Sequence, residues 1–182
     1  MFYFIVEFHK FSLKGDNVLR RLFSWAFDKE KELDLDILRK AQPFKGLSRK
    51  LLGKLLIDLI PKDYTAGETI FSEGDKGKAL YVVMKGSVNI NKITGQGEKV
   101  LARLGPGSYF GELALINNSR RFASAVAEEN TEVLIMYKAY FDDLLKGNSA
   151  ISSQILLNLL ESLASYICIN QVNEQGDANL DK

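Results

Sequence analysis

One short stretch of the chain combines residue types that could bind an anion and a hydroxyl group together. Residues 105–123, GPGSYFGELALINNSRRFA, contain the acid Glu112 and, nine residues later, the base Arg121. A guanidinium can donate two parallel hydrogen bonds to an anion, whereas an ionised carboxylate only accepts hydrogen bonds. A phosphate alone would be repelled by Glu112. The pair therefore predicts a sugar phosphate, whose anion faces Arg121 and whose hydroxyl donates to Glu112.

The residues around this pair suit a close approach between a ligand and the main chain. The stretch is rich in glycine, which has no Cβ to hold a ligand away. The segment ELALIN predicts a short helix, whose free N–H groups at Leu113 and Ala114 would attract a phosphate. A simpler interpretation stays open. Glu112 could cap this helix and form a surface ion pair with Arg121 that contributes under about 1 kcal/mol.

The spacing of apolar residues changes twice along the chain. Residues 17–60 have helical spacing, and LSRKLLGKLLIDLI within them begins at a plausible cap, Ser48, and ends before Pro61. From Tyr64 onward, short β-rich runs alternate with turn signals such as EGDKG, as in a sandwich or jelly roll. Helical spacing returns after Tyr140. We therefore expect a mainly β fold with flanking helices: a β jelly-roll (double-stranded β-helix) barrel with N-terminal helices and a long C-terminal helix.

These changes also divide the chain into segments. We expect an N-terminal helical extension over residues 1–39, the main domain over 40–170 and a polar, disordered tail over 171–182. Within the main domain, the β core would cover about residues 62–138 and the C-terminal helices residues 139–170.

The composition excludes several classes of function. Lys+Arg 24 against Asp+Glu 23 leaves a formal charge of +1, without the basic excess typical of nucleic-acid binding. The single cysteine, Cys168, and the single histidine, His9, cannot build a thiolate cluster, a haem site or the metal site of a jelly-roll enzyme. No stretch of about 20 apolar residues and no signal peptide is visible. We expect a cytoplasmic protein with no metal, no cofactor and no membrane span.

A resemblance to a known protein family makes these expectations more specific. The segment GSYFGELALINNSRRFASAVA closely resembles the phosphate-binding cassette of cyclic-nucleotide-binding domains. That family includes regulatory subunits of cyclic-nucleotide-dependent kinases, cyclic-nucleotide-gated channels and bacterial catabolite activator proteins. PFKGLS, YTAGETIFSEGDKGKALYVVMKGSV and FDDLL also resemble landmarks of the family, so that the likeness covers about residues 40–165.

The resemblance implies a role for each cassette residue. Glu112 matches the acid that accepts the ribose 2′-hydroxyl, and Arg121 matches the arginine that holds the cyclic phosphate. Arg120 would lie on the opposite face of the strand, since side chains alternate. The predicted ligand-binding residues are Gly111, Glu112, Leu113, Ala114, Arg121, Phe122 and Ala123, and no catalytic residue is expected.

Phe122 departs from the family pattern, which usually has a small residue after the cassette arginine. A threonine there favours cyclic GMP, so its absence makes cyclic AMP the expected ligand, ahead of cyclic GMP. The large ring could crowd the ligand or turn outward. A base contact from the last helix, near Asn158 or Tyr166, is left open by the sequence.

Two functions remain open from the sequence. The first is a non-catalytic regulatory module that binds a cyclic nucleotide and passes a helix rearrangement to an unknown protein effector. The alternative is a degenerate fold that binds no nucleotide and serves as an interaction or dimerisation module, in which the apolar face of residues 151–167 forms a homodimer seam. No DNA-binding helix-turn-helix is expected after the long helix.

Overall fold

The structure is a computed structural model that describes residues 24–95, 97–116, 119–147 and 149–177. The chain divides into two compact units, Met1–Asp34 and Leu35–Lys182. In the first unit, the described residues are the beginning of helix α3 (Ser24–Lys40), which crosses the boundary between the units. His9 and the first part of the segment with helical spacing, residues 17–23, lie outside the described residues.

Two further helical segments precede the strands, as the spacing predicted. They are the short helix η1 (Gln42–Phe44) and α4 (Arg49–Asp58). The predicted cap is confirmed, because the Ser48 Oγ accepts a hydrogen bond from the Leu51 N–H at 3.4 Å. Leu52 and Leu55 lie on the buried side of α4.

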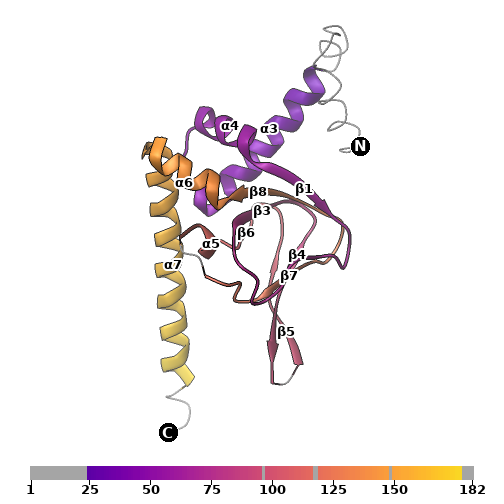
Figure 1. The fold of residues 1–182 in the computed structure, drawn as a ribbon, viewed down its shortest axis with the longest axis vertical. Coiled ribbons are helices and arrows are strands. Elements are labelled where there is room, and N and C mark those ends of the chain that lie inside the picture. Colours follow the sequence, from indigo (N-terminus) through magenta and orange to yellow (C-terminus); the bar gives the residue numbers. More distant parts are fainter. Residues whose placement is uncertain (1–23, 96, 117–118, 148, 178–182) are drawn as a thin grey trace. The chain divides into compact units, whose positions relative to one another are not determined.

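The strands form two antiparallel sheets of four strands each (Figure 1). The first sheet has the order β1 (Ile60–Tyr64), β8 (Thr131–Tyr137), β3 (Ala79–Lys85), β6 (Tyr109–Phe110). The second has the order β2 (Thr69–Phe71), β7 (Ser124–Ala127), β4 (Val88–Thr94), β5 (Gly97–Leu104). Apart from the β4–β5 hairpin, successive strands alternate between the sheets, which is the connectivity of a jelly roll.

Both sheets contribute side chains to the core between them. Val83 and Phe110 from the first sheet pack with Val88 and Ala125 from the second. The Tyr81 and Phe110 rings stack with centroids 5.1 Å apart. This core follows from strand periodicity, since alternate residues of β7 (Ala125 and Ala127) are buried as Val88 is. The predicted mainly β fold with flanking helices is confirmed.

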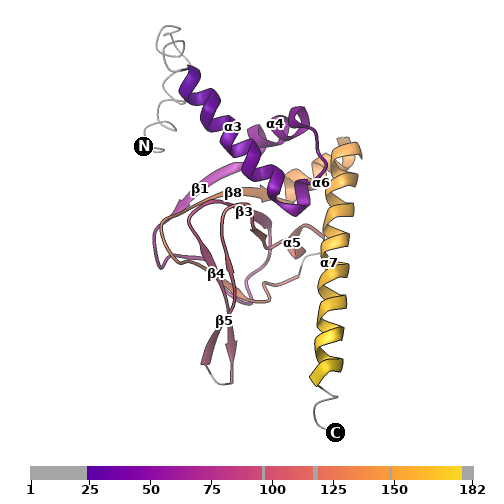
Figure 2. The ribbon, with the colours of Figure 1, turned by 180° about the vertical axis from the view of Figure 1, so that it is seen from behind.

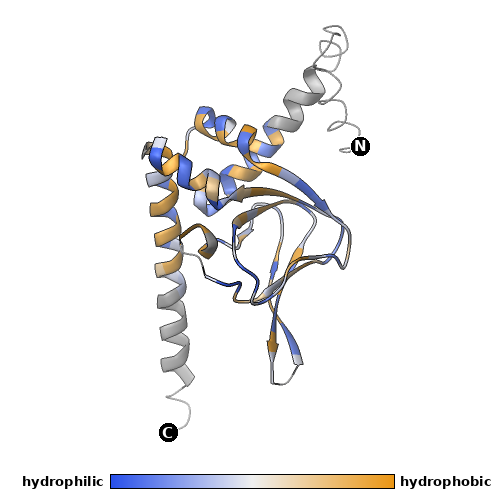
Figure 3. Ribbon diagram, viewed as in Figure 1, coloured by the Kyte–Doolittle hydropathy of each residue, from blue (hydrophilic) through white to orange (hydrophobic). Residues whose placement is uncertain are grey.

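Three helices accompany the second half of the sheets. They are α5 (Leu113–Ile116) between β6 and β7, followed after β8 by α6 (Lys138–Gly147) and α7 (Ser149–Asp177). From both sides, α7 is seen to run alongside α5 (Figures 1 and 2). Apolar residues occupy much of the first half of α7 (Figure 3). Ile155 and Leu159 are buried there in one cluster with Phe44 of η1 and Phe141 of α6.

The end of α7 differs from the expected disordered tail. Its helical backbone continues to Asp177, because no proline or early glycine in INQVNEQGD interrupts it, while residues 178–182 lie outside the described chain. The other predicted domain boundaries stay predictions. None of the described helices is both long and apolar enough to cross a membrane.

Candidate ligand-binding site

Arg121 lies three residues before β7 and turns its side chain into the protein. The residue is 9% exposed. Its Nη1 donates a hydrogen bond to the Gly111 carbonyl at 3.1 Å, and its Nη2 donates to the Ala79 carbonyl at 3.0 Å. The guanidinium carbon lies 4.0 Å from the centroid of the Phe71 ring and 5.6 Å from that of Tyr81. Main-chain oxygens and aromatic faces thus hold the cation in place.

The charge of Arg121 is only partly balanced. Among the described residues, Arg121 forms no ion pair, although the Glu112 and Asp75 carboxylates raise its pKa, and its buried Nε has no hydrogen-bond partner. Burial lowers the pKa of the guanidinium, while the Tyr81 phenol opposes this shift. An arginine stays protonated even so. A buried cation with an unused donor is unfavourable by itself and is well suited to receive an anion.

The main chain around Arg121 is fixed by the loop between β2 and β3. The Arg121 N–H donates to the Asp75 carbonyl at 2.8 Å, and the Gly74 N–H donates to the Arg121 carbonyl at 2.9 Å. The neighbouring Arg120 is exposed, and its Nη1 donates to the Gly74 carbonyl at 2.7 Å. The prediction that the two arginines face opposite ways is confirmed.

Gly111 is required by the contact with Arg121. Its φ is +76°, in the left-handed region, and a Cβ built there would lie 2.5 Å from Arg121 Nη1 and 3.0 Å from the Ala79 oxygen. The guanidinium therefore lies against the bare main chain of the cassette.

Glu112 follows at the start of α5 and is half-buried. Its carbonyl accepts a hydrogen bond from the Leu115 N–H at 2.9 Å, whereas its carboxylate makes no hydrogen bond or ion pair within the described part of the chain. The carboxylate is near enough to raise the pKa of Arg121. The simpler interpretation of a surface ion pair between Glu112 and Arg121 is wrong, because the buried Arg121 bonds to two carbonyls instead.

The other predicted residues take different positions. Leu113 and Ala114 begin α5, with the Leu113 side chain 38% exposed. Ala123 is buried. Phe122 is 66% exposed, and its ring lies 4.0 Å from the Lys92 Nζ rather than beside Arg121. The structure thus brings Gly111, Glu112 and Arg121 together and leaves the Phe122 ring outside.

The sequence analysis did not predict several groups that contribute to this site. The rings of Phe71 and Tyr81 are half-buried beside the guanidinium, and strand alternation could have placed them between the sheets. The Ala79 carbonyl carries no sequence signal at all, because any residue offers the same main-chain oxygen.

Asn158 of α7, a candidate for a base contact, is already engaged. Its Nδ2 donates to the carbonyls of Pro43 at 3.0 Å and Lys45 at 2.8 Å, and its Oδ1 accepts from Gln154 Nε2 at 3.0 Å. Tyr166 is 65% exposed. Asn158 therefore attaches α7 to η1 instead of facing the cassette.

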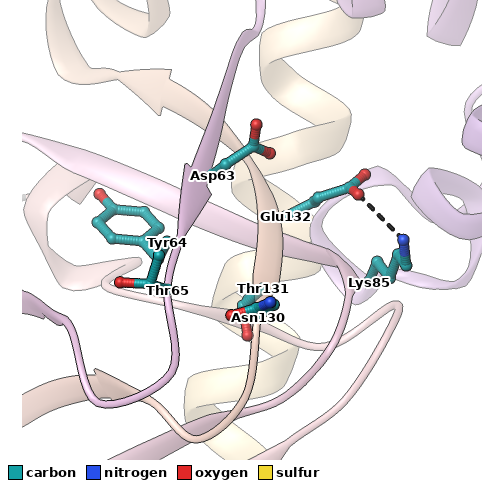
Figure 4. Close-up of a pocket in the computed structure, with 7 residues that line it drawn as sticks. All are labelled: Asp63, Tyr64, Thr65, Lys85, Asn130, Thr131 and Glu132. Carbon is teal, nitrogen blue, oxygen red and sulfur yellow. Dashed lines mark hydrogen bonds and ion pairs between the residues drawn. The ribbon is translucent and has the colours of Figure 1, made fainter. Parts of the chain in front are cut away.

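A pocket of about 280 Å³ lies elsewhere, where β1 and β3 end and β8 begins (Figure 4). Asp63 and Glu132 face each other across β1 and β8, and Lys85 pairs with Glu132 at 3.3 Å. Burial and the neighbouring Glu132 raise the pKa of Asp63. No cassette residue lines this pocket, so it is separate from the candidate site.

Comparison with known proteins shows which domains this fold resembles. The model of the cyclic nucleotide-binding domain matches residues 61–148. The cyclic AMP receptor protein of Thermus thermophilus is 38% identical over 104 residues, which is 57% of this chain and 48% of that protein. The chain thus spans about half the length of this curated relative.

Solved structures of similar fold give the same relationship. The catabolite activator protein of Thermus thermophilus superposes with a TM-score of 0.68 and 32% identity, covering 74% of this chain and 62% of that one. The regulatory domain of Toxoplasma gondii PKA with cAMP gives a TM-score of 0.59 and 31% identity, covering 63% and 44% respectively. Residues 61–148 therefore match the model of the cyclic nucleotide-binding domain, and the similar proteins and structures carry such domains.

Proposed function

We propose that this chain is a non-catalytic regulatory module that binds a cyclic nucleotide, with cyclic AMP favoured over cyclic GMP. The observation that carries the proposal is the buried Arg121, whose guanidinium forms no ion pair and whose Nε is unused among the described residues. The Thermus thermophilus relative is named for cyclic AMP, and the Toxoplasma gondii structure contains it. The proposed location is the cytoplasm.

Each part of the ligand has a counterpart in the site. Arg121 would direct its free Nε toward the cyclic phosphate, and the N–H groups of Gly111, Leu113 and Ala114 would add neutral donors. Glu112, whose carboxylate forms no hydrogen bond or ion pair within the described chain, would accept the ribose 2′-hydroxyl. Ala123 would leave room beside the sugar phosphate. The exposed Phe122 would not touch the ligand, which removes the steric objection to binding.

The cassette also has direct connections to the helices that would carry the signal. The Lys138 Nζ, at the start of α6, donates to the Leu115 carbonyl of α5 at 3.0 Å and to Asp142 at 3.0 Å. The hydroxyls of Tyr109 and Ser162 share a hydrogen bond between β6 and α7. A ligand that pulls α5 toward Arg121 would change the energy of these contacts and thereby shift α6 and α7 against a protein effector.

Calorimetry with cyclic AMP tests the proposal. Arg121→Ala should weaken binding by about 2–5 kcal/mol, the range for breaking a desolvated charge pair. That range corresponds to roughly 30-fold to several thousand-fold in affinity. Arg120→Ala is the matched control, because it removes the adjacent but exposed guanidinium, and it should leave affinity within about twofold of wild type. Equal affinities of wild type and Arg121→Ala would refute the role given to Arg121.

The second candidate function is dimerisation without nucleotide binding. It is favoured by the exposure of Leu157 (55%) and Leu160 (57%), which occupy neighbouring positions on one side of α7. A thermal-shift assay separates the two functions. A melting temperature that does not rise with millimolar cyclic AMP or cyclic GMP would support the interaction module, and sedimentation would then report a homodimer seam.

A further inference from the structure

Phe122, the residue that departs from the family pattern, has an unusual partner. Lys92 of β4 donates from its Nζ to the Phe122 carbonyl at 2.6 Å and to Glu73 Oε1 at 2.7 Å. The same Nζ lies 4.0 Å from the centroid of the Phe122 ring. One ammonium group therefore binds the main chain, a carboxylate and an aromatic face together.

The ion pair between Lys92 and Glu73 connects β4 with the loop after β2 and with the start of β7. Glu73 belongs to the loop after β2, where its N–H donates to Ser124 Oγ at 2.9 Å and its Oε2 accepts from the Ile93 N–H at 3.4 Å. The Lys92 side chain is 25% exposed and that of Glu73 is 31% exposed. The hydrogen bond from Lys92 holds the pKa of Glu73 below its usual range. Such an ion pair, held by several further bonds, differs from the isolated surface pairs that contribute little.

The position of Lys92 along β4 explains what the cluster does. The pairing of β4 with β7 ends at Asn91 and Ser124, so Lys92 is the first residue of β4 beyond it. On the side of β4, the segment that precedes β7 and carries Arg121 is therefore not paired with a strand. The Lys92 side chain continues the connection, because it reaches the carbonyl of Phe122, the residue directly after Arg121.

We propose that Lys92 is a positioning residue for Arg121, and that the Phe122 ring turns outward to cover the Lys92 ammonium. Together with Glu73, it holds the main chain after Arg121 so that the guanidinium stays against the carbonyls of Gly111 and Ala79. This inference rests on the proposed function, since it concerns how the anion-binding group is presented. It assigns Phe122 a role outside the ligand pocket.

Calorimetry with cyclic AMP tests the inference on the full chain. Lys92→Met keeps most of the side-chain volume but removes the charge and the donors, and it should weaken binding about tenfold. Lys92→Arg keeps the charge, the donors and the contact with the ring, and it should stay within about threefold of wild type. Lys99→Met is the control, since Lys99 is an exposed lysine directly opposite Lys92 on β5, and it should leave affinity unchanged.

A second background separates positioning from a direct contact with the ligand. If Lys92 acts through Arg121, then Lys92→Met should change affinity by less than about twofold in a chain that already carries Arg121→Lys. An undiminished tenfold loss in that background would mean that Lys92 touches the nucleotide itself and would overturn the inference. The melting temperature without ligand is measured for each variant.

The outcomes also distinguish this inference from the proposed function. If wild type binds cyclic AMP and Lys92→Met binds it equally well, the positioning role is wrong and the function stands. If Lys92→Met and Lys92→Arg lose affinity and melting temperature alike, the cluster serves stability alone and the inference is again overturned. If wild type itself does not bind cyclic AMP, the proposed function and the positioning role of Lys92 are both wrong.

Discussion

At the scale of single residues, neutral acceptors hold Arg121 by its two Nη groups and leave its Nε without a partner among the described residues. Two carbonyls and the Phe71 ring orient the guanidinium without neutralising it. A carboxylate in their place would fill the site before any ligand arrived. Under the proposed function, this arrangement preorganises the site for an anion, and binding would relieve the cost of the buried charge.

Gly111 allows a direct prediction at this scale. Gly111→Ala places a methyl group against Arg121 Nη1 and forces an alanine into a left-handed conformation with φ near +76°. The backbone term should lower stability by about 1–2 kcal/mol. The displaced guanidinium should weaken cyclic AMP binding by at least about tenfold, measured by calorimetry.

Gly67→Ala is the matched control for that variant. Gly67 has a φ of +82°, yet nothing lies within 4 Å of the Cβ that would be added. It should therefore show a similar loss of melting temperature with unchanged affinity. If both variants bind cyclic AMP as wild type does, the contact between Gly111 and Arg121 is not needed for binding.

The sequence predicted the part of the site that is local in the chain. Glu112 and Arg121 lie within one loop-and-helix stretch, and their chemistry could be inferred without a fold. The Ala79 carbonyl and the Lys92 ammonium come from other strands, so their approach depends on sheet register. Alternation placed Arg120 correctly, and the same rule would have turned Phe122 outward once Arg121 was taken as buried.

At the scale of elements, α7 is attached to η1 by one buried amide. Asn158 satisfies the carbonyls of Pro43 and Lys45, neither of which could be inferred from helical spacing, which predicted only the apolar stripe of α7. A polar residue within such a stripe fixes where along the helix the attachment occurs. The apolar contacts of Ile155 and Leu159 alone would tolerate a shift more easily.

Asn158→Ala should therefore lower stability by more than an exposed polar substitution does. It leaves two carbonyls without donors, at a cost of about 1–3 kcal/mol of unfolding free energy, measured by urea denaturation. Ser165→Ala, at an exposed position on the same helix, should change that free energy by less than about 0.5 kcal/mol. Equal effects of the two variants would show that the apolar stripe, and not the amide, anchors α7.

At the scale of the whole domain, two hydrogen bonds between described residues connect the cassette with α6 and α7. Lys138 connects the end of α5 to α6, and Tyr109 connects β6 to Ser162 of α7. Tyr109 lies within the cassette, two residues before Gly111, so under the proposed function a ligand-driven movement of Gly111 and Glu112 is expected to change the contact of its hydroxyl. This hydrogen bond would then couple the proposed ligand site to the long helix.

Tyr109→Phe tests this coupling, because it removes the hydroxyl and keeps the ring in the core. Without ligand, the amides of residues 155–166 should exchange about fivefold faster than in wild type, as expected for the loss of a hydrogen bond of about 1 kcal/mol. Cyclic AMP should still bind within about threefold of wild type, since Tyr109 is not assigned a ligand contact. The change in exchange that the ligand causes in α7 should be smaller than in wild type.

Hydrogen exchange with mass spectrometry measures both effects, and Tyr140→Phe provides the comparison. Tyr140 donates to Asp58 at 3.0 Å, so this variant also removes a tyrosine hydroxyl and its bond, but between α6 and α4. It should leave the ligand response of α7 as in wild type. If Tyr109→Phe responds to cyclic AMP as fully as wild type and Tyr140→Phe do, the signal reaches α7 by another route.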